Sequence, residues 1–374
     1  MKPQHNFSTS DRIRVCIRKR PRNDKEVKSN DPDIVCITNS CTVTVKEQKM
    51  SLDLSRYIHQ HVMHFDEVFD DSSSNADVYG RTVKPLVEFI LNKGVAVCFS
   101  FGQTGAGKTY TMIGDKFTMA SATAAATTSS ATAAAAAATA DNKNVNDENL
   151  GLWVSFYEIY CGQLFDLLND RKKLIVMEKH NKQVCITGLM ETYVKDLNAL
   201  IQAINYGRSN RSRGCSGVNP VSSRSHAVLQ FDVRCKDSNR RIGRLTFIDL
   251  AGSERASDAM MCSKQTRQEG AEINQSLLAL KECIRCLDQE QPYKPYRQSK
   301  LTHILRESFT DNCRTVMIAN ISPTQSACEN TMNTLRYADR CVFVCVCVSV
   351  LCVVPVCFYL FYLCIMFICY KISS

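Results

Sequence analysis

Residues 95–114 read VAVCFSFGQTGAGKTYTMIG, and this stretch decides the fold. The apolar run that ends at Phe101 is typical of a buried strand. The pattern GxxxxGKT follows it directly at 102–109, and it is the complete phosphate-binding loop spacing. Its glycines let several backbone N–H groups point at one anion, and a helix begins where the loop ends. A chance glycine turn is the alternative, but it requires every position of the pattern to match by coincidence.

The residue types of this loop predict a nucleoside triphosphate with Mg²⁺. Lys108 reaches the β- and γ-phosphates, and the Thr109 hydroxyl binds the metal ion. The predicted nucleotide-binding residues of this stretch are Gly102, Gln103, Thr104, Gly105, Ala106, Gly107, Lys108, Thr109 and Tyr110.

Strand and helix patterns alternate outward from the loop. Alternating or apolar runs at 13–17 and 152–160 predict strands, and apolar residues at helical spacing predict a helix over 272–288. Another apolar strand, at 242–248, ends at Asp249, where a carboxylate can hold the Mg²⁺ shell. We therefore predict an α/β fold with a central, mostly parallel mixed sheet and helices on both faces.

Composition narrows the class of protein. The 374 residues include 46 basic and 37 acidic side chains, and the net charge of +9 suits a polyanionic partner such as nucleic acid, a membrane surface or an acidic protein lattice. The 20 cysteines form no framework of the secreted type, which indicates a reducing compartment. Cys283-x-x-Cys286 has no second pair nearby, so we interpret it as packing rather than as a zinc site.

Several motifs in this chain resemble those of kinesin motor domains. They stand in the family's order: RKRP at 18–21, the loop at 102–109, NPVSSRSH at 219–226 and DLAGSE at 249–254. The loop alone indicates only a P-loop nucleotidase, whereas SSRSH together with DLAGSE is specific to the family. The resemblance covers roughly 12–114 and 151–340. It implies a cytoplasmic, cytoskeletal ATPase that binds ATP, Mg²⁺ and microtubules, with no nucleic acid as partner.

The resemblance also implies residue roles. Thr109, Ser223 and Asp249 would surround Mg²⁺, the last through water. Those implied to flank the adenine are Arg18, Arg20, Pro21 and Tyr110. Those implied to be catalytic are Lys108, Ser223, Arg224, Asp249, Gly252 and Glu254.

Two mobile loops would close over the nucleotide, and we call them the first switch segment (219–226) and the second switch segment (249–254). In the family's pattern Gly252 senses the γ-phosphate through its N–H group, and Arg224 pairs with Glu254 as a latch. An ordinary surface ion pair is the alternative for these two side chains. Loss of the γ-phosphate contacts would release the loops.

A tubulin-binding face is implied over 264–306. Basic residues there suit an acidic lattice and predict salt-sensitive binding, and a solvated helix face is the alternative. The implied microtubule-binding residues are Lys264, Arg267, Lys281, Glu282, Cys283, Arg285, Arg297, Lys300 and Arg306.

Within the family the chain is most similar to the internal-motor group, kinesin-13, whose members remove tubulin from microtubule ends. Lys281-Glu282-Cys283 matches that group's signature. The group's Lys-Val-Asp finger is replaced here by residues 51–53, Ser-Leu-Asp, and only 11 residues precede Arg12, which leaves no room for the group's basic neck. In spite of these two departures, the similarity to kinesin-13 predicts a depolymerase. The alternative is a catalytically weak or inactive microtubule binder.

We place the motor domain at 12–340, after a disordered arm at 1–11, and two segments of the chain depart from the family pattern. Residues 120–140 contain only Ala, Ser and Thr, so the insert or replacement at 115–150 lacks the large side chains of a core helix. Residues 341–374 form a hydrophobic tail, which is either a membrane anchor or the translation of a non-coding repeat. Without heptads, a monomer is expected.

Overall fold

The structure is a computed structural model. It describes residues 13–51, 53–114, 150–179, 184–213, 223–254, 264–288, 291, 293–306 and 313–341. The predicted arm, the Ala/Ser/Thr segment and the hydrophobic tail after its first residue, Cys341, lie outside the described residues, so those predictions stay predictions. Among the described helices none is long and apolar enough to cross a membrane.

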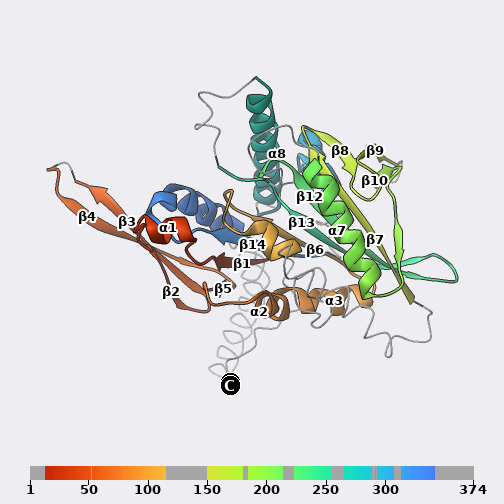
Figure 1. Ribbon diagram of the computed structural model, residues 1–374, viewed down its shortest axis with the longest axis horizontal. Coiled ribbons are helices and arrows are strands. Elements are labelled where there is room, and N and C mark those ends of the chain that lie inside the picture. Colours follow the sequence, from red (N-terminus) through yellow and green to blue (C-terminus); the bar gives the residue numbers. More distant parts are fainter. Residues whose placement is uncertain are drawn as a thin grey trace, which may run out of the picture.

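One large sheet runs through the molecule (Figure 1). Its strand order is β10-β9-β8-β7-β12-β13-β6-β14-β1-β5, and β11 pairs with β7. The strands are β1 (Ile13–Lys19), β5 (Glu67–Phe69), β6 (Val95–Phe101), β7 (Leu150–Tyr160), β8 (Gln163–Asp166), β9 (Lys172–Glu178), β10 (Val184–Thr187), β11 (Thr192–Val194), β12 (His226–Cys235), β13 (Arg241–Asp249) and β14 (Cys313–Ile321).

The α/β fold with a mixed sheet is confirmed, but the parallel share was predicted too high. The four parallel pairs are β13–β6, β6–β14, β14–β1 and β1–β5, whereas the other six described pairs of this sheet are antiparallel. The reason is local. Cys161 and Gly162 alone join β7 to β8, and 236–240 join β12 to β13, and such short connections allow only antiparallel pairing.

Helices cover both faces, as predicted. One apolar core lies between the sheet and α2 (Asn75–Val78), α3 (Lys84–Leu91), α4 (Lys108–Ile113) and α7 (Leu197–Arg213). The other core lies under α8 (Lys264–Asp288), α9 (Lys300–Ile304) and a helix at 328–341. A π-helical turn, Tyr79–Val83, joins α2 to α3, and the shorter elements are α1 (Asp24–Lys28), η4 (Tyr296–Gln298) and η6 (Gln325–Ala327).

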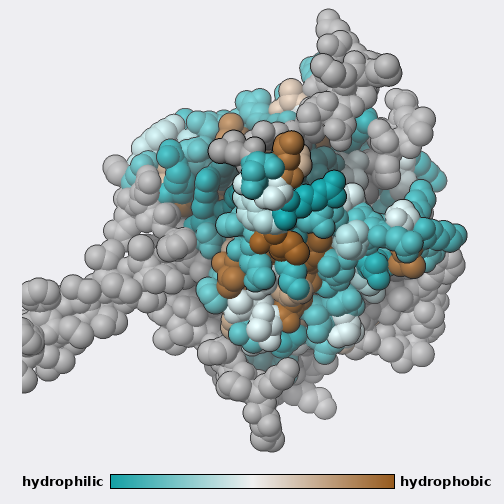
Figure 2. All heavy atoms as spheres, turned by 90° about the vertical axis from the view of Figure 1, so that its left-hand side faces the viewer, coloured by the Kyte–Doolittle hydropathy of each residue, from teal (hydrophilic) through white to brown (hydrophobic). Residues whose placement is uncertain are grey.

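A small antiparallel sheet, β2 (Val35–Asn39), β3 (Thr42–Met50) and β4 (Arg56–His64), projects from one end of the molecule (Figure 1). Its β3–β4 turn carries the residues that stand where the family has its finger. Figure 2 looks onto this end and shows hydrophobic side chains gathered on the face among hydrophilic ones. The exposed apolar residues of this hairpin are Met50, Leu54, Tyr57, Ile58 and Val62.

The helix predicted over 272–288 is longer than its apolar pattern indicates, since α8 begins at Lys264. Cys283 and Cys286 lie on its buried side, and no group of three or more potential metal ligands occurs among the described residues. The interpretation of this pair as packing agrees with that burial.

Gly243 provides a test of how β13 packs on α3. A Cβ at this position would lie 2.0 Å from the backbone oxygen of Ile90, which cannot move without shifting the end of α3. We expect Gly243→Ala to lower the free energy of unfolding by about 1–3 kcal/mol in urea denaturation. Gly80→Ala is the matched control, because a Cβ there meets no atom within 4 Å and the change is expected to be neutral or slightly stabilising. Equal midpoints for the two variants would contradict this packing.

Candidate functional site

The ends of four parallel strands place the site. Because β13, β6, β14 and β1 run in the same direction, the segments that follow them meet at one edge of the sheet. The backbone N–H of Ser253 donates to the Gly102 carbonyl at 3.1 Å, and the Arg20 side chain donates to the Gly105 carbonyl at 2.8 Å. The structure thus brings together the predicted phosphate loop, the second switch segment and the end of β1.

The phosphate loop has the conformation that its sequence predicts. Gly107 adopts φ +95°, a left-handed conformation that favours glycine, immediately before α4. The buried ammonium group of Lys108 donates to the carbonyls of Gly102 and Gln103 at 2.9 and 2.8 Å. Burial lowers the pKa of Lys108, and the nearby carboxylates of Asp249 and Glu254 act in the opposite direction. The phosphate loop therefore encloses the positively charged ammonium group of Lys108.

Asp249 is the most enclosed acid of the site, with 1% of its side chain exposed. Its Oδ2 accepts from the Thr109 hydroxyl at 2.7 Å and from Arg211 Nη1 at 2.8 Å. A hydroxyl beside a carboxylate is the oxygen chemistry that Mg²⁺ prefers, so the residues present fit that ion. Ser223, the third predicted Mg²⁺ ligand, lies beside the second switch segment, because its carbonyl accepts from the Gly252 N–H at 2.9 Å.

Arg211 is the residue that the sequence analysis missed. It lies near the end of α7, past the point where the apolar pattern stops, and it also donates to the carbonyl of Ser225 at 2.8 Å. No motif marks it, since a basic residue near a helix end is ordinarily a solvated one. It joins α7 to both switch segments through buried bonds.

The predicted latch between Arg224 and Glu254 is not formed in this structure. Arg224 Nη1 donates instead to Glu269 Oε2 on α8 at 2.7 Å, and Glu254 accepts from the backbone N–H of Thr104 at 2.8 Å. The cause is the burial of Glu269, which is 6% exposed and also accepts from the Tyr160 hydroxyl at 2.6 Å. A buried carboxylate that lacks such partners is costly, so Glu269 competes well for the arginine.

The residues predicted to flank the adenine separate into two groups. Tyr110 and Pro21 are exposed at the surface. Arg18 is buried instead, donates to Asn75 Oδ1 at 2.6 Å and places its guanidinium 5.4 Å from the centre of the Tyr110 ring. Arg18 therefore supports the ring from behind and does not itself line the surface.

The residues predicted for the tubulin-binding face lie at different depths in the structure, and one of them requires a correction. Cys283 is fully buried with Leu280 and Ile284, because its position on α8 faces the core, so it does not belong to the outer face. Arg285 is exposed and pairs with Glu282 at 2.8 Å. The remaining predicted residues on α8 are Lys264 and Arg267, in its first turn, and Lys281, which is half-buried.

Glu178 on β9 neutralises part of that face. It accepts from Arg297 at 2.8 Å and from Arg306 at 2.8 Å, whereas Lys300 is exposed. The bonds from these two arginines lower the pKa of Glu178 to about 2. Two of the predicted microtubule-binding cations are therefore held by a carboxylate of the same chain.

Comparison with known proteins agrees with this geometry. A family model described as "Kinesin motor domain" matches residues 18–344. "Kinesin-like protein KIF24" of Mus musculus is 51% identical over 335 residues, which are 89% of this chain and 24% of the relative. "Kinesin-like protein KIN-13B" of Arabidopsis thaliana is 48% identical over 335 residues, 88% of this chain and 47% of the relative. The chain thus spans about a quarter of KIF24 and about half of KIN-13B.

A solved structure shares the fold. It is described as "Structure of a fast kinesin: Implications for ATPase mechanism and interactions with microtubules", with a TM-score of 0.76 and 33% identity over 89% of this chain and 92% of that one. The presence of KIN-13B among the relatives supports the predicted similarity to the internal-motor group. On its sequence match, its sheet and its phosphate loop, this chain belongs to the kinesin motor-domain family.

Proposed function

We propose that this chain hydrolyses ATP with Mg²⁺ and couples that reaction to binding of microtubules. The observation that carries the proposal is the meeting of Lys108, Thr109 and Asp249 at one phosphate loop, beside the Gly252–Ser223 bond between the switch segments. Phosphoryl transfer needs positioning and charge stabilisation rather than a covalent nucleophile, and these residues supply both.

Each of these groups has a defined task in the proposal. Lys108 would bind the β- and γ-phosphates, and Thr109, Ser223 and Asp249 would hold Mg²⁺. The ion, when bound, neutralises charge on the phosphate oxygens. The Gly252 N–H, which now donates to Ser223, would donate to a γ-phosphate oxygen instead. Both switch segments would then move when that phosphate group arrives or leaves.

The exchange of partners by Arg224 would accompany this movement. In the structure it is bound to Glu269 on α8, so a pair with Glu254 requires that contact to break. Closure of the two switch segments over the nucleotide would therefore break one bond between the first switch segment and α8, the helix of the tubulin-binding face. Arg20, Pro21 and Tyr110 would contact the adenine.

The partner in this proposal is the microtubule lattice, which places the chain on the cytoskeleton of the cytoplasm. The KIN-13 relatives and the Lys281-Glu282-Cys283 signature favour a depolymerase over a walking motor. The Ala/Ser/Thr segment at 120–140, which lacks the large side chains of a core helix, favours the second candidate, a microtubule binder with weak or no turnover. We take the chain to act as a monomer.

Phosphate release by the full chain, with and without microtubules, separates the two candidates. Stimulated turnover supports the motor, and binding without turnover supports the inactive binder. Loss of polymer from stabilised microtubules, dependent on ATP, then tests depolymerisation. Equal polymer with and without ATP would contradict the kinesin-13-like activity.

Neutralising Glu178 is expected to strengthen filament binding. Glu178→Gln removes the charge that pairs with Arg297 and Arg306, so the face becomes more positive towards an acidic lattice. In co-sedimentation we expect an affinity about two- to fivefold higher at low salt, with the gain vanishing at high salt. Glu88→Gln is the control, because it makes the same charge change at an exposed position of α3, on the opposite face of the sheet. If both variants gain affinity equally, net charge rather than this cluster is responsible.

A further inference from the structure

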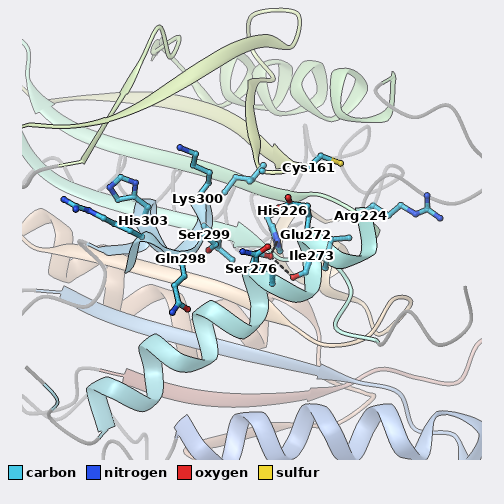
Figure 3. Close-up of a pocket in the computed structure, with 15 residues that line it drawn as sticks. Cys161, Arg224, His226, Glu272, Ile273, Ser276, Gln298, Ser299, Lys300 and His303 are labelled. Carbon is cyan, nitrogen blue, oxygen red and sulfur yellow. Dashed lines mark hydrogen bonds between the residues drawn. The ribbon is translucent and has the colours of Figure 1, made fainter. Parts of the chain in front are cut away.

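His226 is a buried side chain that the proposed mechanism does not use. It is the first residue of β12 and the last of the first switch segment, and it is 3% exposed. Its Nδ1 lies 3.0 Å from the backbone nitrogen of Ala251. Its Nε2 lies 2.8 Å from Ser276 Oγ, and Figure 3 shows these two side chains. One imidazole therefore touches the second switch segment on one side and α8 on the other.

The geometry fixes where the imidazole proton is. A backbone N–H can only donate, so Nδ1 must accept from Ala251. Burial, together with the charges of Arg211 and Lys108, lowers the pKa of His226 to about 3, and the ring is neutral near pH 7. A neutral ring whose Nδ1 accepts carries its proton on Nε2.

The chain of bonds therefore has one direction. His226 Nε2–H donates to Ser276 Oγ, and the Ser276 hydroxyl donates to the carbonyl of Ile273 at 2.7 Å within α8. Each donor in this series is matched by one acceptor, and no group in it can be reversed without leaving the Ala251 N–H unpaired. The series begins one residue before Gly252, the proposed sensor of the γ-phosphate.

We propose that His226 is a positioning residue that transmits movement of the second switch segment to α8 through Ser276. This inference rests on the proposed function, since it names the route between the nucleotide site and the filament-side helix. Movement of 250–252 towards a phosphate group pulls on the Ala251–His226 bond. Because β12 holds only the backbone of His226, the pull acts on the imidazole, which passes the displacement to α8 at Ser276.

The surroundings of Ser276 allow such a movement. A cavity of about 290 Å³ lies between α8, the start of β12 and the η4–α9 segment, and Arg224, His226, Ser276 and Lys300 are among the residues that line it (Figure 3). This pocket is open to solvent and is lined partly by the exposed side chains of Gln298 and Lys300, so α8 is not tightly packed on this side and has room to shift against the imidazole.

The ordinary alternative is a buried histidine whose bonds only satisfy its own polar atoms. Ser276→Ala and Ser276→Thr separate the two, since threonine keeps the hydroxyl and alanine removes it. The measurement is release of a fluorescent ADP analogue from the full chain, alone and with microtubules. For Ser276→Ala we expect spontaneous release within about twofold of wild type and microtubule-accelerated release about tenfold slower. For Ser276→Thr we expect both rates to stay near wild type.

His226→Asn is the second variant. The asparagine side-chain oxygen can still accept from the Ala251 N–H, but the side chain cannot reach Ser276. His226→Asn should therefore lose the acceleration of release by microtubules to the same extent as Ser276→Ala. The double variant His226→Asn/Ser276→Ala should lose no more than either single variant. Additive losses, full acceleration in Ser276→Ala, or equal impairment of the alanine and threonine variants would each overturn the proposal. If wild type itself shows no acceleration by microtubules, the proposed function fails, and this inference fails with it. Unchanged thermal midpoints show that the variants are folded.

Discussion

Replacing Lys108 with alanine is expected to lower ATP turnover by about 10²- to 10³-fold. The ammonium group lies at the centre of the phosphate loop and donates to the carbonyls of Gly102 and Gln103. A triphosphate would offer oxygens with more negative charge than those carbonyls, so the group would transfer to the β- and γ-phosphates. Without it, the charge that develops during transfer lacks its nearest fixed cation.

The same substitution should also uncouple the filament. If the switch segments respond to the γ-phosphate, a chain that cannot hold this group should leave microtubules at the same rate with and without ATP. Release measured by stopped-flow light scattering tests this consequence, and phosphate release tests turnover. ATP-dependent release at the wild-type rate in Lys108→Ala would contradict the nucleotide-driven mechanism.

Two controls make the Lys108 result interpretable. Lys108→Met keeps most of the volume of the buried side chain, so a loss in both variants is a loss of charge and not of packing. Lys172→Ala removes one positive charge from an exposed position on β9, far along the sheet from the loop. That variant should keep wild-type turnover.

The phosphate loop could be predicted from the sequence because all its parts are consecutive. Its glycines, its lysine and its threonine follow one strand, and backbone conformation alone brings them together. The contact between Thr109 and Asp249 could also be predicted. Thr109 follows β6 and Asp249 ends β13, and neighbouring parallel strands end at the same edge of the sheet.

Other features depended on information that a motif does not contain. Arg224 had two acidic partners within reach, and the choice of Glu269 over Glu254 follows from how deeply α8 buries Glu269. Cys283 was assigned to the outer face through a signature, although its three-residue spacing from Leu280 already indicated the inner side of the helix. The share of antiparallel pairs was predicted too low, because single strand patterns carry no sign of direction and the short connections after β7 and β12 were not used.

Arg211 is the clearest case, and it leads to the second large effect. Replacing Arg211 with methionine is expected to lower the free energy of unfolding by about 3–5 kcal/mol. The substitution leaves the carboxylate of Asp249, 1% exposed, with the hydroxyls of Thr109 and Ser100 and without its arginine partner. An uncompensated buried charge costs far more than a lost surface pair, which is worth about 1 kcal/mol at most.

Urea denaturation without nucleotide measures the Arg211 effect, and α7 itself supplies the control. Arg213→Met changes an exposed arginine two positions further along the same helix and should shift the midpoint little. Arg211→Met combined with Asp249→Asn should recover much of the loss, since the buried charge is then removed together with its partner. Equal midpoints for Arg211→Met and Arg213→Met would show that the buried pair does not stabilise the site. A double variant no more stable than Arg211→Met would show instead that the arginine acts through its bond to Ser225, and that the first switch segment depends on it.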